Sequence, residues 1–107
     1  MPDLPDGSNF FCTVETDSKP AKIAKAFHSP TWSVRKSTWT DLQIESEFAE
    51  LEIVAAEPPL ISGSVADVLV NAPRIVESLV AAGFSGSFEC YDPSGELILE
   101  QRFGNAS

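Results

Sequence analysis

The chain has 107 residues, of which 43% are hydrophobic and 21% charged, and this length fits one compact domain with a single core. Sixteen acidic residues against seven basic ones give a formal net charge of −9. This balance argues against nucleic acid as the main ligand, because phosphate-binding surfaces are rich in lysine and arginine. Purely apolar runs such as Ile53 to Ala56 are short, whereas a membrane-crossing helix needs about 20 residues. We therefore expect no membrane span.

The two ends of the chain and its two cysteines indicate the cellular compartment that we expect for this protein. Residues 1–8 carry acids and prolines where a secretory signal carries bases and then apolar residues, so we expect a cytoplasmic protein with a flexible segment there. The folded domain is expected to span residues 9–103, and residues 104–107 to form a disordered tail. Cys12 and Cys90 lie in apolar, strand-like runs, which indicates two buried free thiols. A disulfide between the two cysteines remains an alternative only if their strands are neighbours and the two Cα atoms lie within about 7 Å of each other.

The first elements follow from local patterns. Residues 9–16 alternate between two sets of side chains, which is typical of a strand with one buried face. Asp17 and Ser18 can accept hydrogen bonds from the first amides of a helix, and Pro20 suits its first turn. A short amphipathic helix is therefore expected to follow and to end at Phe27.

The middle of the chain is harder to assign. Residues 32–45 alternate in two stretches, which predicts two strands or one bent strand. Residues 48–56 fit a strand and a helix, and we favour a strand because Ile53 and Val54 are β-branched. Residues 57–63 contain two prolines and a glycine, which remove ladder donors and loosen the chain. That segment is expected to be a connector.

A second helix is expected after this connector. Ser64 and Asp67 have the spacing of a capping box, which predicts a helical turn or two that Pro73 then interrupts. Asn71 can cap a fresh start, after which an apolar stripe continues until Gly83 ends the helix.

The last part of the chain predicts a hairpin. Residues 87–91 and 96–103 flank the sequence Asp92 to Gly95, which suits a tight turn. The whole order of elements predicts an α+β domain with an antiparallel sheet of five or six strands and two helices packed on one face. The polar side chains that alternate with the buried ones must then lie on the opposite, solvent-exposed face of the sheet or at its edges. Much of the negative charge should lie on one exposed sheet surface.

Charge is also segregated along the chain. Residues 18–40 hold five bases and no acid, whereas residues 41–73 hold seven acids and no base. A focused negative field speeds encounter with a cationic protein, although net charge also keeps a small domain soluble. We select five acids of this stretch, with the two tryptophans of the chain as interface anchors, for contact with a basic protein partner. They are Asp41, Glu45, Glu47, Glu50, Glu52, Trp32 and Trp39.

The same residues give little support for metal or acid–base chemistry. The acids lack the glycine-centred spacing of a calcium loop, and alternation with Leu51 and Ile53 places Glu50 and Glu52 in solvent. His28 is the only histidine, and a cation at the end of the predicted helix is explained by the helix dipole. No nucleophile elbow, Cys-x-x-Cys pair, phosphate loop or dinucleotide fingerprint occurs. We expect no enzyme, no cofactor and no metal.

In size, acidity and lack of catalytic motifs, the chain resembles the immunity proteins that bacteria make against their own secreted toxins. This resemblance is one of general character, and no family residue carries over with it. It implies a non-catalytic inhibitor or escort that neutralises a cognate toxin by direct binding.

Two alternatives to such an inhibitor stay open. One is a small enzyme or ligand-binding domain with a pocket between helix and sheet, using Tyr91, His28 and Cys90 or Cys12. The other is an oligomeric accessory subunit that pairs through an exposed strand edge such as residues 96–103. The choice between a monomer and a homodimer stays open as well.

Overall fold

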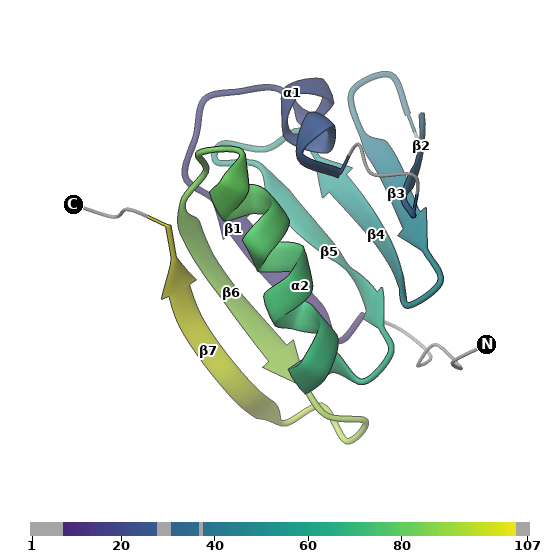
Figure 1. Ribbon diagram of the computed structural model, residues 1–107, viewed down its shortest axis with the longest axis vertical. Coiled ribbons are helices and arrows are strands. Elements are labelled where there is room, and N and C mark those ends of the chain that lie inside the picture. Colours follow the sequence, from purple (N-terminus) through teal and green to yellow (C-terminus); the bar gives the residue numbers. More distant parts are fainter. Residues whose placement is uncertain (1–7, 28–30, 37, 105–107) are drawn as a thin grey trace.

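The computed structural model describes residues 8–27, 31–36 and 38–104 and is built around one sheet (Figure 1). Its strands are β1 (Phe10–Val14), β2 (Ser33–Lys36), β3 (Leu42–Ser46), β4 (Ala49–Val54), β5 (Leu60–Val65), β6 (Gly86–Tyr91) and β7 (Leu97–Phe103). They form a seven-stranded antiparallel sheet in the order β2-β3-β4-β5-β1-β6-β7. The predicted α+β class with an antiparallel sheet is confirmed, but the sheet has seven strands rather than five or six.

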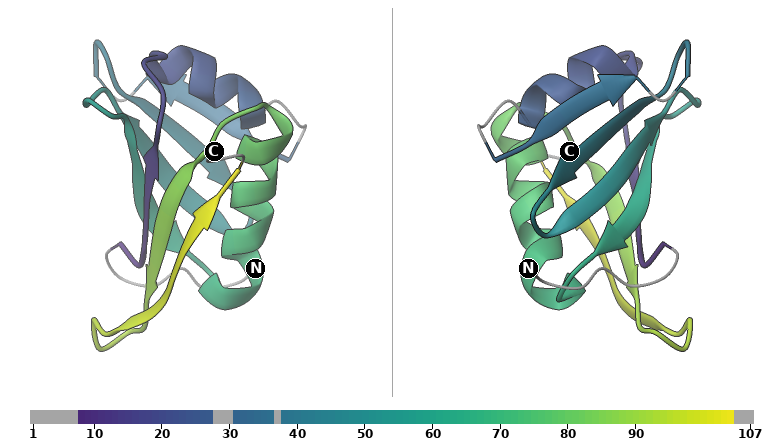
Figure 2. Two further views of the ribbon diagram at one scale, coloured as in Figure 1. Left: turned by 90° about the vertical axis from the view of Figure 1, so that its left-hand side faces the viewer. Right: turned by 90° about the vertical axis from the view of Figure 1, so that its right-hand side faces the viewer.

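Two helices complete the fold. Helix α1 (Pro20–Ala24) continues as a short 3-10 turn, η1 (Lys25–Phe27), and the longer helix is α2 (Val68–Ala81). Figures 1 and 2 show α1 and α2 on the same side of the sheet. In agreement with this view, α2 contacts β5, β6 and β7, while α1 contacts β3 and β4.

One hydrophobic core lies between the sheet and the helices. Alternate residues of the strands point into it, so that Phe10 on β1 and Ile53 on β4 are fully buried while their chain neighbours are not. The helices contribute Phe27, Ile75 and Leu79, which are also buried. Period-two burial on the strands therefore divides the sheet into a covered face and an uncovered one.

Strand β5 is the largest departure from the prediction. The expectation that residues 57–63 form a connector is wrong, because the chain from Leu60 onward pairs with both β1 and β4. The two prolines, Pro58 and Pro59, precede the strand and so remove no donor from it. Gly63 does not loosen the chain: a Cβ at this position would lie 2.0 Å from the Glu50 carbonyl oxygen. Close strand approach therefore requires glycine there.

The second helix also differs from the prediction. Ser64 lies in β5, and α2 begins at Val68 after Asp67, whose φ is 45°. One helix continues through Pro73, because burial of its apolar side on the sheet outweighs the hydrogen bond that proline removes. The prediction that Asn71 caps the start of a new helix is wrong, because Asn71 lies inside α2. Its side-chain amide donates a hydrogen bond to the Ala66 carbonyl oxygen at 2.5 Å.

Several smaller predictions can be compared directly. β2 and β3 are two strands rather than one bent strand, and β4 is a strand as favoured. The N-cap of α1 is Lys19, and no side chain caps that helix, so the assignment of Asp17 and Ser18 as caps is wrong. The predicted hairpin turn is present, with the Gly95 N–H donating to the Asp92 carbonyl oxygen at 2.9 Å.

The predictions for the ends of the chain concern segments that lie mostly outside the described residues. These are residues 1–7 and 105–107, and His28 falls outside as well. The expected flexible segment, the expected tail and the interpretation of His28 therefore stay predictions.

Candidate functional site

The sheet face turned away from the helices, which we call the open face, is the candidate site. Side chains reach it because they alternate with the buried residues of each strand. The described residues on it are Phe11, Thr13, Glu15, Ser33, Arg35, Gln43, Glu45, Glu50, Glu52, Val54, Leu60, Ser62, Ser64, Ser87, Glu89, Tyr91, Leu97, Glu100 and Arg102.

The centre of the open face is apolar. Phe11 lies on β1, between β5 and β6 in the sheet, and 41% of its surface is exposed. Its ring packs edge-on against Tyr91, with 5.5 Å between the ring centroids. A depression of about 490 Å³ is lined by both rings, by Ser8 and Asn9, and by Asp92, Pro93 and Gly95 of the β6–β7 turn. An exposed phenylalanine beside a tyrosine at the centre of a sheet is the type of group that anchors protein interfaces.

Carboxylates flank Phe11 on both sides. In the row of residues that crosses the sheet at Phe11, Ser62 and then Glu52 follow on one side. Glu89 and then Glu100 follow on the other side. Since neighbouring strands are about 4.8 Å apart, these acids lie within roughly 10 Å of the Phe11 backbone. The apolar centre is therefore surrounded by negative charge.

Two pairs of acids on this face lie directly across from each other on neighbouring strands. Glu45 faces Glu50, and Glu89 faces Glu100. Arg35 forms an ion pair with Glu45, with 2.6 Å between Nη2 and Oε1. Like charges directly opposite each other destabilise a sheet. The open face thus carries an electrostatic cost to folding that a cationic ligand would relieve.

The hydroxyl group of Tyr91 is affected by the carboxylates of Glu89 and Glu100. Its hydroxyl donates a hydrogen bond to Glu89 Oε2 at 3.3 Å. Partial burial, then the negative charge of Glu89 and its hydrogen bond, then the charge of Glu100 raise the pKa of Tyr91 above its ordinary value. The phenol therefore stays protonated and remains a hydrogen-bond donor at the centre of the face.

A second depression lies among the acids of β4. It has a volume of about 320 Å³, and its lining includes Gln43, Glu50, Glu52 and Ser62. Ser8 lines both this depression and the one beside Phe11, so the two adjoin. Carboxylate and amide oxygens in such a hollow suit the ammonium or guanidinium group of a partner side chain, which accepts no hydrogen bonds and only donates them.

The structure places only part of the predicted site on the open face. Glu45, Glu50 and Glu52 lie there. Asp41 precedes β3, and its Oδ1 atom accepts a hydrogen bond from the Ala55 N–H at 2.9 Å, so this carboxylate holds two loops together. Glu47 is exposed in the turn between β3 and β4.

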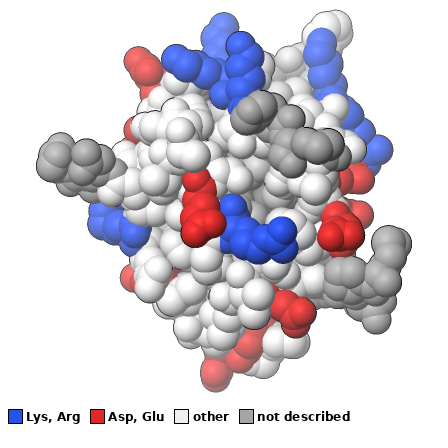
Figure 3. Space-filling model, viewed as in Figure 1, with Lys and Arg blue, Asp and Glu red and all other residues white. Residues whose placement is uncertain are grey.

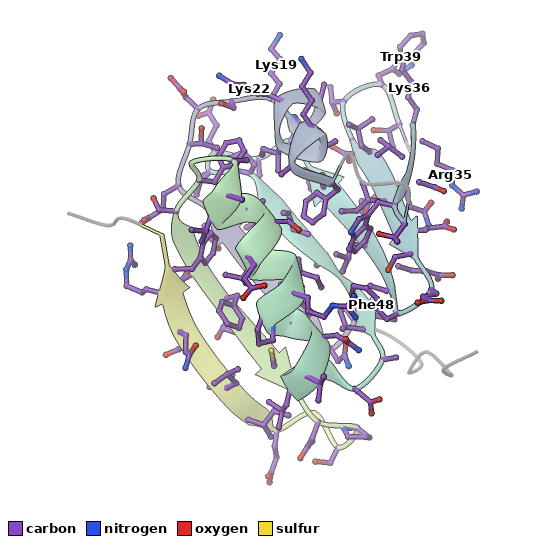
Figure 4. All side chains as sticks on the ribbon, in the orientation of Figure 1. Lys19, Lys22, Arg35, Lys36, Trp39 and Phe48 are labelled. Atoms are coloured by element: carbon purple, nitrogen blue, oxygen red, sulfur yellow. The ribbon has the colours of Figure 1, made fainter. Side chains whose placement is uncertain are left out.

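The two predicted tryptophans lie in different environments. Trp32 is partly buried, and its ring packs edge-on against Phe27 and Phe48 at centroid distances of 5.0 and 5.4 Å. It serves the core. Trp39 is 96% exposed, and Figure 4 shows it beside Lys36 at one end of the molecule. Lys22 of α1 and Lys19, which precedes this helix, lie at the same end, where Figure 3 shows basic side chains gathered. Trp39 therefore belongs to a cationic end and not to the acidic rows.

Sequence reasoning missed the apolar centre of the open face. A signal for it was present, because Phe10 and Phe11 are consecutive in a strand and therefore point to opposite faces. A sheet with one covered face can bury only one of them, and the structure buries Phe10 completely.

Metal clusters, membrane-spanning helices and reactive thiols are further features to which the described residues can be compared. Within residues 8–27, 31–36 and 38–104, no group of three His, Cys, Asp or Glu side chains could hold a metal, and no helix there is long and apolar enough to cross a membrane. Cys12 and Cys90 are free and buried, and burial raises their pKa values to about 12 and about 11. Such protonated thiols are poor nucleophiles.

Comparisons of this chain with models of protein families, with curated proteins and with solved structures found no match. The open face is therefore the basis for a proposal about function.

Proposed function

We propose that this protein is a non-catalytic binding protein that holds a basic protein partner on its open face. The observation that carries the proposal is the position of Phe11: an exposed aromatic ring at the centre of a face, with Glu89 opposite it on β6 and Glu52 two strands away on β4. The more specific form of the proposal is an immunity-type inhibitor that neutralises a cognate toxin by direct binding.

The two parts of the face have different physical roles. The ring of Phe11, when covered by a partner, loses its water and supplies binding energy, as interface hot spots do. The surrounding carboxylates raise the rate of encounter with a positively charged surface and fix its orientation. Binding should therefore be fast at low salt and should weaken as salt rises.

Solubility alone accounts for the charge but not for the ring. A small domain gains solubility from net charge placed anywhere on its surface. It gains nothing from an exposed phenylalanine at the middle of the acidic face, because exposed aromatic groups favour association. An exposed aromatic ring among carboxylates is expected of a surface that a protein partner covers when it binds.

The proposal is tested by capturing proteins from the source cells on the immobilised chain. Wild type should retain a basic protein at low salt. Phe11→Ala should weaken this binding by about 2 kcal/mol, or roughly 30-fold. The double variant Glu50→Lys/Glu52→Lys should abolish it. Glu77→Lys, which makes the same charge change at an exposed position of α2, is the matched control and should bind normally.

The captured protein then distinguishes an inhibitor from an escort. An immunity-type role requires that the purified chain suppress the activity of that protein at a one-to-one ratio, and that Phe11→Ala lose this effect. Retention of the partner by both open-face variants, or its equal loss with Glu77→Lys, would overturn the proposal.

A further inference from the structure

The two edges of the sheet differ. β2 has four residues, two of which are Arg35 and Lys36, and short charged edges resist pairing with another strand. β7 has seven residues and begins with Leu97, Ile98 and Leu99. All of β7 except Leu99 and Phe103 is exposed. It is therefore the edge available for pairing with a further strand.

The hydrogen bonds of the sheet show which backbone groups on this edge are free to pair. In an antiparallel pair, opposite residues either exchange two hydrogen bonds or none, in alternation. The Glu15 N–H donates to the Ser85 carbonyl oxygen at 2.8 Å, and the Tyr91 N–H donates to the Asn9 carbonyl oxygen at 2.9 Å. Odd-numbered residues of β6 therefore bond to β1, and even-numbered ones bond to β7.

The register between β6 and β7 shows which residues of β7 direct their backbone groups toward β6. The even-numbered residues of β6 lie opposite Leu99, Gln101 and Phe103, so these three direct their backbone groups inward. Glu100 and Arg102 consequently direct their N–H and carbonyl groups away from the sheet. These are the groups that a further strand would meet.

A bulge limits the usable length of the edge. Cys90 lies opposite Leu99, but the next residue, Tyr91, lies opposite Leu97. Such an irregularity bends and twists the strand. The regular part of the edge therefore runs over residues 99–103, and its midpoint is Gln101.

We propose that β7 pairs antiparallel with β7 of a second copy of this chain, about a twofold axis at Gln101. This register sets Glu100 opposite Arg102 of the second copy, and Arg102 opposite Glu100 of the second copy. Both pairs join outward-directed backbone groups and opposite charges. An axis at Glu100 or at Arg102 would instead set like charges opposite each other, and an axis at Leu99 or Phe103 would leave part of the regular edge unpaired.

The side chains suit this register. Arg102 is already held on the open face by an ion pair with Glu15, with 2.6 Å between Nη2 and Oε1. A guanidinium group has five N–H donors, so it can also bond to Glu100 of the second copy. On the other face the same register sets Leu99 opposite Phe103. The dimer joins the two sheets edge to edge and leaves Phe11 exposed, so it does not require the proposed binding function, although Glu100 lies both on the open face and at the dimer contact.

Charge exchange across the axis gives a direct test by sedimentation velocity. Wild type should sediment as a dimer of the 11.5 kDa chain. Glu100→Arg alone and Arg102→Glu alone should each be monomers, since each creates two repulsive contacts in a homodimer. An equal mixture of the two variants should form a heterodimer, because both contacts then join an arginine to a glutamate.

Further variants guard against unfolding as the cause of a monomer. Glu100→Pro removes an outward-directed N–H without touching the β6–β7 ladder, and should be a folded monomer by circular dichroism. Glu50→Arg, the same charge reversal on β4, should remain a dimer. The proposal is overturned if wild type is a monomer, if Glu100→Arg or Glu100→Pro remains a dimer, or if the mixture does not associate.

Discussion

Glu45 on β3 and Glu50 on β4 lie directly opposite each other on the open face, within the hairpin that these two strands form. Opposite side chains at such positions have Cβ atoms about 5 Å apart, so two carboxylates meet there. Arg35 offsets the charge of Glu45 through its ion pair. The arrangement is unfavourable for the isolated fold and favourable for contact with a cation, as expected where function and stability conflict.

Replacing Glu50 should therefore stabilise the protein. Glu50→Gln removes one of the two facing charges and keeps the shape of the side chain, and it should raise the free energy of unfolding by about 0.5 kcal/mol at low salt. The gain should shrink as salt screens the repulsion. Urea unfolding at low and high ionic strength measures it. Glu47→Gln, in the exposed turn, is the control and should change little, and a loss of stability in Glu50→Gln would contradict the interpretation.

Phe10 and Phe11 are neighbours in sequence whose replacement should lower the free energy of unfolding by very different amounts. Phe10 is fully buried, so Phe10→Ala should lower the free energy of unfolding by about 3 to 5 kcal/mol. Phe11 is 41% exposed and rests on Tyr91, so Phe11→Ala should cost only about 1 kcal/mol. Urea unfolding compares the two. A large loss in Phe11→Ala would show that this ring serves the fold and would remove the anchor of the proposed interface.

The strands that the sequence predicts well are those with alternating side chains. β1, β4 and β6 are of this kind, because burial of one face imposes a local period of two. β5 escaped prediction because Gly63 and the preceding prolines are common in loops. The reason for this glycine lies in β4, where the Glu50 carbonyl oxygen occupies the space of a side chain. No pattern within residues 57–63 contains that information.

The candidate site was predictable to a similar degree. Glu50 and Glu52 could be placed on an exposed face because they alternate with apolar residues. Trp32 and Trp39 have the same local character, and only tertiary contacts separate them. Trp32 packs against Phe27, which comes from a different element, whereas Trp39 is 96% exposed. The fate of a large aromatic side chain depends on neighbours that are distant in sequence.

Gly63→Ala tests the close approach of β4 and β5. The new Cβ would lie 2.0 Å from the Glu50 carbonyl oxygen and 2.8 Å from the Leu51 Cα. Because both atoms belong to the backbone, the strands must separate, and the free energy of unfolding should fall by about 3 kcal/mol or more. Gly83→Ala is the control: it has open space around it but a φ of +91°, so it should cost only about 1 kcal/mol. Equal losses in urea unfolding would contradict the steric argument.

The buried thiols should make stability depend on alkaline pH. Burial raises the pKa of Cys12 to about 12 and of Cys90 to about 11, above the ordinary value of 9.0. Below about pH 9 both thiols are protonated in the folded and unfolded chains, so their contribution is fully present. As pH rises above that value, the unfolded chain releases protons that the folded chain retains, and the free energy of unfolding should fall.

A cysteine-free variant isolates this effect. Cys12→Ala/Cys90→Ala should lose stability less steeply between about pH 9 and pH 10.5 than wild type, although Tyr91, whose pKa is also raised, should leave some slope. Urea unfolding at a series of pH values measures both curves. At neutral pH a thiol reagent should label neither cysteine in the folded chain and both in urea, because deprotonation and access require unfolding. Rapid labelling of the folded chain, or parallel pH curves, would show that the thiols of Cys12 and Cys90 are not enclosed in the core between the sheet and the helices.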